Sequence, residues 1–113
     1  MEGKEGNKVR DVRGRGLRIG DYVLIQKAPD YPGVLEGDLG RLVGDQYFLS
    51  DGSVNVDVCS INEEEDHMVN LNFSPTELRR IDERTLIRSR IPKSFNPDRI
   101  LKQYVAISNY RCD

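Results

Sequence analysis

The side chains most able to do chemistry gather around the single histidine of the chain, His67, which follows an acidic run at 63–66. A histidine beside carboxylates can exchange protons near neutral pH or bind a transition metal. No cysteine adjoins His67 in the sequence, and one imidazole does not complete a transition-metal site. We therefore predict that His67 is a solvated residue at the edge of a loop.

The same acidic run, together with Asp45, Asp51 and Asp57, offers the oxygen ligands that calcium prefers. The spacing does not match an EF-hand loop, because the chain has no Asp-x-Asp-x-Asp-Gly run followed by a glutamate at the twelfth position. We expect no bound metal here. A basic partner surface is the use of these acids that we favour.

The two cysteines, Cys59 and Cys112, are too few for a disulfide framework. Neither forms a recognisable nucleophile–base pair with the histidine, and the chain has no phosphate-binding loop. We therefore expect a non-enzymatic protein with no catalytic residue, no cofactor and no small-molecule substrate. Reduced thiols and an N-terminus without an apolar stretch predict an intracellular protein, in cytoplasm, nucleus or organelle stroma, that is not secreted. No apolar run is long enough to span a membrane.

Aromatic residues near the mouth of the barrel that we predict below are candidate contacts: Tyr22, Tyr31, Tyr47 and Phe48. Such residues can form a cation–π cage for methylated lysine or arginine, although core packing is the interpretation that we favour for most of them. Tyr31 is the exception, because prolines flank it within a polar loop. The partner-binding residues that we predict are Asp30, Tyr31, Glu36, Asp38 and Tyr47, and they would contact a protein with a basic surface.

Charge is distributed unevenly along the 113 residues, whose net charge is −2. Residues 1–18 carry a net charge of +3, residues 19–82 carry −9, and residues 83–113 carry +4. The two basic arms flank an acidic centre, and arginine side chains contact phosphates and stack on bases. As an alternative function, the arms would bind nucleic acid in a transcription or translation factor, through Arg13, Arg15, Arg88 and Arg90.

The acidic centre reads as a series of short β-strands. Apolar runs at 22–25 and 39–43 are joined by a loop with prolines and glycines, in which Gly37 suits a positive φ and Gly40 a close approach of two backbones. Asp51-Gly52 between 46–49 and 54–58 predicts a hairpin. Alternation at 54–58 and again at 67–73 predicts half-buried antiparallel strands.

A helical turn and a helix complete the expected elements. Ser74-Pro75-Thr76-Glu77 is a capping box and predicts a short helical turn before a last strand at 78–81. Asn96-Pro97 predicts the start of a C-terminal helix over 97–109. We expect one face of this helix to carry Ile100, Leu101, Tyr104, Val105 and Ser108. A strand is the alternative, since residues 104–107 are also β-prone.

These observations predict a mainly β protein: a small SH3-like antiparallel barrel, with a helical turn before its last strand and a C-terminal helix. We divide the chain into a flexible basic tail at 1–16, the barrel at 17–82, and a basic extension at 83–113. The pattern resembles SH3-like barrels of the KOW type, carried by Gly20, Asp21, Val23, Gly37, Asp38, Gly40, Phe73 and Leu78. It is also similar to tudor-like readers and to the electron-transfer docking subunit of photosystem I.

The resemblance implies an interaction module, and charge decides which kind we favour. KOW-type barrels present basic loops to nucleic acid, whereas residues 19–82 of this chain carry −9. Phosphate groups would be repelled by such a barrel. The sequence therefore favours docking of the acidic barrel onto a basic protein surface. The further alternative is a small docking subunit of a larger assembly, including an electron-transfer one.

Overall fold

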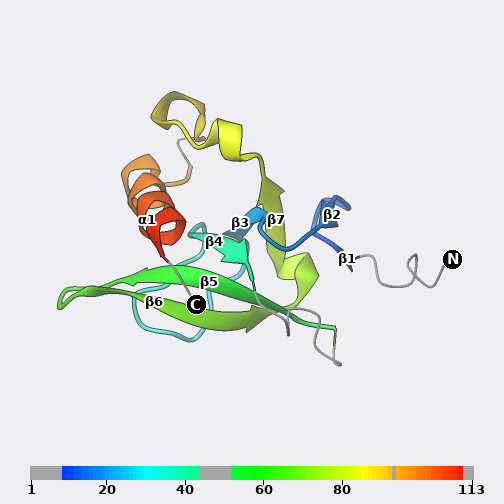
Figure 1. The fold of residues 1–113 in the computed structure, drawn as a ribbon, viewed down its shortest axis with the longest axis horizontal. Helices are drawn as coiled ribbons and strands as arrows, with labels where there is room; N and C mark the ends of the chain where they lie inside the picture. Colours follow the sequence, from blue (N-terminus) through cyan, green and yellow to red (C-terminus); the bar gives the residue numbers. More distant parts are fainter. Residues whose placement is uncertain (1–8, 44–51, 93, 111–113) are drawn as a thin grey trace, which may run out of the picture.

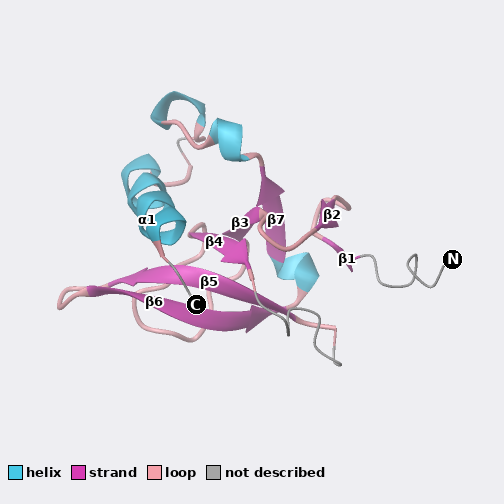
Figure 2. Ribbon diagram, in the orientation of Figure 1, coloured by secondary structure: helices cyan, strands magenta, loops and turns pink. Residues whose placement is uncertain are grey.

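Seven β-strands and a C-terminal α-helix appear in a computed structural model that describes residues 9–43, 52–92 and 94–110 (Figures 1 and 2). Strands β1 (Val9–Arg10) and β2 (Gly16–Leu17) pair with each other. The other strands form a five-stranded sheet in the order β6-β5-β4-β3-β7. Their bounds are β3 Tyr22–Ile25, β4 Leu39–Leu42, β5 Val54–Ile61, β6 Asp66–Phe73 and β7 Leu78–Ile81.

All neighbouring strands of the larger sheet are antiparallel, and β3 pairs with both β4 and β7. Within the described ranges no pairing joins β6 to β7, so the fold is two antiparallel sheets, and the closed barrel of the sequence prediction is not seen. The N-terminal segment accounts for this difference. The backbone N–H of Val12 donates to Leu78 O at 2.8 Å, and Asp11 Oδ2 accepts from Arg80 N at 2.6 Å. The outer edge of β7 is thus already occupied.

Two apolar clusters lie on the two faces of the sheet. Val23, Val56 and Val58 are fully buried in the first cluster, and the alternation at 54–58 predicts this burial for the two valines of β5. Asp57 and Cys59 on the other face of β5 are buried as well, so the prediction of a half-buried strand is wrong here. In the second, Leu24 and Leu39 pack against Ile100 of α1 (Pro97–Asn109). The residues that we interpreted as a C-terminal extension therefore supply part of the core, and Figure 1 shows α1 lying across the sheet.

Local capping explains where the helical segments begin. The backbone N–H of Ser74 donates to Glu77 Oε1 at 3.0 Å in a capping box, which confirms the predicted turn before β7. Asn96 Oδ1 accepts from Arg99 N at 3.2 Å, and the helix begins at Pro97. The C-terminal helix is confirmed, and the strand alternative for this segment is wrong.

The buried face of α1 differs from the predicted one. Its buried residues are Ile100, Gln103 and Ile107, whereas Val105 is 56% exposed. The prediction put Val105 on the buried face because its side chain is apolar. The buried face is instead defined by Ile100 and Ile107, and Gln103 lies between them on the same face.

Some expectations about loops are met and others lie outside the described residues. Gly37 has a φ of 93°, and a Cβ at Gly40 would overlap a methyl group of Val56 on β5. Residues 9–17, part of the stretch that we interpreted as a flexible tail, form the β1–β2 hairpin. Residues 1–8 and the predicted strand at 46–49 with Asp51 lie outside the described ranges. Among the residues that the structure describes, no helix has the length and apolar character to cross a membrane.

Candidate functional site

The loop between β3 and β4, residues 26–38, is fastened to the end of the β5–β6 hairpin. Ser60 Oγ donates to Pro32 O at 2.7 Å, and the backbone N–H of Ile61 donates to Gly33 O at 3.0 Å. Gly33 has a φ of 85°, and a Cβ there would overlap Ser60 Oγ. Only glycine allows this close approach without strain. The loop therefore has a defined position on the hairpin.

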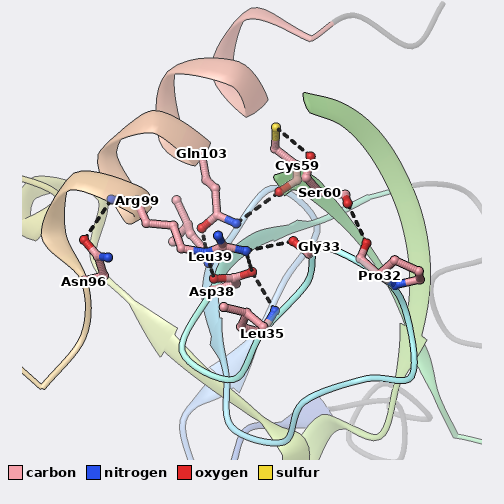
Figure 3. A network of polar contacts seen from close by, with 10 residues as sticks. All are labelled: Pro32, Gly33, Leu35, Asp38, Leu39, Cys59, Ser60, Asn96, Arg99 and Gln103. Carbon is pink, nitrogen blue, oxygen red and sulfur yellow. Dashed lines mark hydrogen bonds and ion pairs between the residues drawn. The ribbon is translucent and has the colours of Figure 1, made fainter. Parts of the chain in front are cut away.

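Asp38 holds the same loop to the helix, as Figure 3 shows. Its carboxylate accepts from Arg99 Nε at 2.7 Å, from Arg99 Nη2 at 2.9 Å and from the backbone N–H of Leu35 at 2.8 Å. Arg99 Nη2 also donates to Gly33 O at 2.7 Å. Asp38 is 2% exposed, so this predicted partner contact lies beneath the surface and anchors the loop.

Gln103 makes a second buried link between α1 and the sheet. Its Oε1 accepts from Leu39 N at 3.0 Å, and its Nε2 donates to Cys59 O at 3.0 Å (Figure 3). The ladder pairs Gly40 with Val58, so Leu39 and Cys59 stand at the next position, where the side-chain amide bridges the two strands. Gln103 is not among the residues predicted from the sequence. The i, i+4, i+7 spacing of Ile100, Tyr104 and Ile107 would have indicated that face.

Tyr31 lies against His67 of β6. The hydroxyl of Tyr31 is 3.3 Å from His67 Nε2, and the ring centroids are 6.3 Å apart. Both residues are partly buried, and Tyr31 packs against the first apolar cluster. His67 Nδ1 is buried without a hydrogen-bond partner in the described structure. His67 does stand beside the β5–β6 turn, but the prediction that it is solvated is wrong, because Tyr31 of the loop lies against it and its Nδ1 is buried.

Exposed carboxylates lie on the two segments that make this contact, the β3–β4 loop and the β5–β6 turn. Asn62 Oδ1 accepts from the backbone N–H groups of Glu64 at 2.9 Å and Glu65 at 3.0 Å, and this fixes the turn. Asp66 pairs with Lys102 at 2.8 Å. Five exposed acids on the loop and the turn have no ion-pair partner in the described part of the chain, and with Tyr31 we call them the acidic surface: Asp30, Glu36, Glu63, Glu64 and Glu65.

The predicted partner residues thus separate into three groups. Asp30, Tyr31 and Glu36 belong to the acidic surface, whereas Asp38 lies behind it. Tyr47 lies outside the described residues, as do Asp45, Phe48 and Cys112. Tyr22 is buried in the second cluster, with Arg41 Cζ 5.5 Å from the ring centroid. Its ring therefore contacts a cation of its own chain.

The predicted nucleic-acid residues are also separated. Arg13 is exposed on the β1–β2 turn, and Arg15 and Arg90 line one cavity although 75 positions separate them in the sequence. The side chain of Arg88 lies outside the described residues.

The structure does not favour reactivity of the Cys59 thiol. Burial and the nearby Asp66 carboxylate raise the pKa of the Cys59 thiol, which is 2% exposed. A raised pKa and burial both suppress thiolate reactivity. Among the described residues no group of three or more His, Cys, Asp or Glu side chains could hold a metal ion.

Comparisons with protein-family models, with curated proteins and with solved structures find no match to this chain. Two regions of the described structure are therefore the candidates for function: the acidic surface, and the cavity lined by Arg15 and Arg90.

Proposed function

We propose that this chain is a non-enzymatic interaction module of the cell interior that docks its acidic surface onto a basic protein partner. The observation that carries the proposal is the fastening of the β3–β4 loop to the β5–β6 hairpin, through Pro32, Gly33 and Tyr31. These contacts hold together two segments, distant in the sequence, that carry exposed carboxylates and one partly buried tyrosine. A surface ordered before binding loses less conformational entropy when the partner arrives.

Charge gives this surface its selectivity. Unpaired carboxylates attract a basic partner and repel acidic ones, so they raise the association rate and set the specificity. These interactions are screened over about 8 Å at physiological ionic strength, so affinity should fall as salt is added. Tyr31 adds an apolar contact with a polar tip, the kind of residue enriched at the centre of interfaces.

The strand order supports an SH3-like fold of the KOW or tudor-like type as the finer form of this proposal. The last strand, β7, follows a 3-10 turn at Pro75–Glu77 and pairs with β3, the first strand of the sheet. The closing pair between β6 and β7 is what separates the observed sheet from a complete barrel. A docking subunit of a larger assembly would use the acidic surface in the same way.

A binding assay with the full chain tests the proposal. The probe is a lysine- and arginine-rich peptide, and an acidic peptide of equal length serves as the comparison. The double variant E36K/E64K reverses two charges of the acidic surface, and D82K/E83K reverses two exposed acids beyond β7. We expect E36K/E64K to weaken binding by about tenfold or more, and D82K/E83K by less than about threefold.

Equal losses in the two double variants would refute the acidic surface, because general charge attraction would then explain the binding. A second readout is Tyr31→Ala, which should accelerate dissociation of the peptide, whereas charge reversal should mainly slow association. Tighter binding of the acidic peptide than of the basic one would also refute the proposal.

A further inference from the structure

An arginine-lined cavity lies beside β7 and involves none of the residues of the acidic surface. Its volume is about 220 Å³, and four of its lining residues are arginines: Arg15, Arg79, Arg80 and Arg90. Among the described residues that line it, Asp82 alone carries a carboxylate. The four arginines come from three elements, the β1–β2 turn, β7 and the 3-10 turn Arg88–Arg90. The fold thus gathers positive charge that is dispersed in the sequence.

Two of these four arginines already interact with other groups of the chain. Arg80 Nε lies 3.5 Å from Asp21 Oδ2, and Arg15 Nη1 donates to Arg80 O at 3.5 Å. Arg79 and Arg90 have no ion-pair partner within the described ranges. Like charges gathered around one cavity repel each other, and an anion between them removes that cost. Arg79 and Arg90 are therefore the groups available to a ligand.

Apolar residues line another part of the cavity, together with Thr85. Leu24, Ile81, Pro92 and Phe95 line it beside the arginines. Phe95 is half-buried, and its ring lies 3.1 Å from the place where a Cβ of Gly37 would stand, so the ring is backed by the β3–β4 loop. The site can therefore contact a charged group at one side and an apolar or aromatic group at the other.

We propose that this cavity binds a phosphomonoester, with the phosphate between Arg79 and Arg90 and its organic group against Ile81 and Phe95. A phosphomonoester carries a charge of about −1.5 to −2 at neutral pH and three acceptor oxygens. Such a ligand matches two forked guanidinium donors better than a ligand with a single carboxylate does. The volume, about 220 Å³, is smaller than the 300–1,000 Å³ typical of drug-sized ligands, so it suits one small group.

A single phosphate group fits this chain better than a nucleic-acid strand does. The cavity is confined to one place, whereas a strand needs a continuous groove of positive potential along its backbone. Residues 19–82 carry a net charge of −9, which opposes a long polyanion much more than a small dianion. The inference is independent of the proposed function, because it uses different residues and a ligand of opposite charge.

Calorimetry on the full chain tests the inference with three probes: phenyl phosphate, inorganic phosphate and benzoate. We expect phenyl phosphate to bind most tightly, because it alone combines a dianion with an aromatic group. R79Q and R90Q should each weaken its binding by about tenfold, the loss of one charge-assisted contact. R84Q is the matched control, since Arg84 is an exposed arginine of the neighbouring turn that does not line the cavity. The affinity of R84Q for phenyl phosphate should equal that of the parent.

Several results would overturn the inference. One is equal binding of the three probes with no effect of R79Q or R90Q, which would indicate nonspecific anion attraction. Another is a single-stranded oligonucleotide without a terminal phosphate that binds more tightly than phenyl phosphate and loses affinity in the same variants, which would indicate a nucleic-acid surface. Thermal unfolding of each variant separates loss of the ligand site from loss of the fold, and a fold lost in both R79Q and R90Q would make the arginines structural.

Discussion

Arg99 and Asp38 form a two-pronged ion pair, with Nε 2.7 Å from Oδ1 and Nη2 2.9 Å from Oδ2. Their side chains are 19% and 3% exposed, so water screens the pair little. The pair joins the β3–β4 loop, which carries Tyr31, to the helix α1 some 60 positions later in the chain. The position of the acidic surface therefore depends on the C-terminal helix.

Removing one member of this pair should destabilise the protein strongly. R99Q leaves the Asp38 carboxylate buried without its counter-ion, and loss of one partner of a buried pair costs about 3–5 kcal/mol. K102Q is the control, because it breaks the exposed pair with Asp66, and exposed pairs contribute about 0–1 kcal/mol. Urea unfolding measures both free energies. Equal, small losses in the two variants would contradict the anchoring role of Asp38.

Gln103 should stabilise the junction of β4 and β5 through both ends of its amide. Q103L leaves the N–H of Leu39 and the C=O of Cys59 without these partners, and an unsatisfied buried group costs about 1–3 kcal/mol. Hydrogen exchange at the amide of Leu39 should become much faster than in the parent. The control V105Q changes an exposed position of the same helix and should alter stability by about 0.5 kcal/mol or less. Unchanged exchange at Leu39 would refute this bridging role.

The sequence indicates local structure well and non-local pairing poorly, for a physical reason. Alternation at Val54, Val56 and Val58 and the capping box at Ser74 depend on neighbours, so strands and turns could be predicted. Whether β6 meets β7 depends on what else reaches the edge of β7, and Asp11 does so from 69 positions away. A glutamine such as Gln103 is expected at the surface from sequence alone, and only its buried hydrogen bonds to Leu39 and Cys59 explain its place in the core.

The same limit applies to the two candidate sites. One short loop contains Asp30, Tyr31 and Glu36, so it could be identified from the sequence as an acidic contact region. Asp38 shares that loop and looks equivalent, but its burial is decided by Arg99 on a distant helix. The arginine-lined cavity brings residues of both basic arms onto β7, which no local pattern in the sequence reveals.

Gly40 should tolerate no side chain, because β5 approaches its backbone closely. In Gly40→Ala the new Cβ would overlap a methyl group of Val56 and lie 3.2 Å from Asp57 O. Overpacking of this kind costs about 1–3 kcal/mol. Gly16→Ala is the control, since nothing lies within 4 Å of a Cβ there. Thermal unfolding should show a clearly lower midpoint for Gly40→Ala alone, and similar midpoints in the two variants would contradict the close packing of β4 on β5.

Tyr104 should lose its proton unusually late, because its hydroxyl donates to Glu83 Oε2 at 2.6 Å. The hydrogen bond to this carboxylate is the main cause that raises the pKa of Tyr104 from 10.0 to about 12. The folded protein thus keeps a proton that the unfolded chain loses first. The contribution to stability is complete below pH 10 and disappears as the pH rises through about 12.

Absorbance titration of the tyrosines measures this shift, and Tyr104→Phe identifies the late-titrating group. Glu83→Gln keeps an acceptor oxygen but removes the charge, so the pKa of Tyr104 should move back toward 10.0. Glu63→Gln is the control, because Glu63 is an exposed acid on the β5–β6 turn, whereas the hydrogen bond from the Tyr104 hydroxyl is accepted by Glu83. The same pKa in the parent and in Glu83→Gln would show that the carboxylate does not hold the phenol.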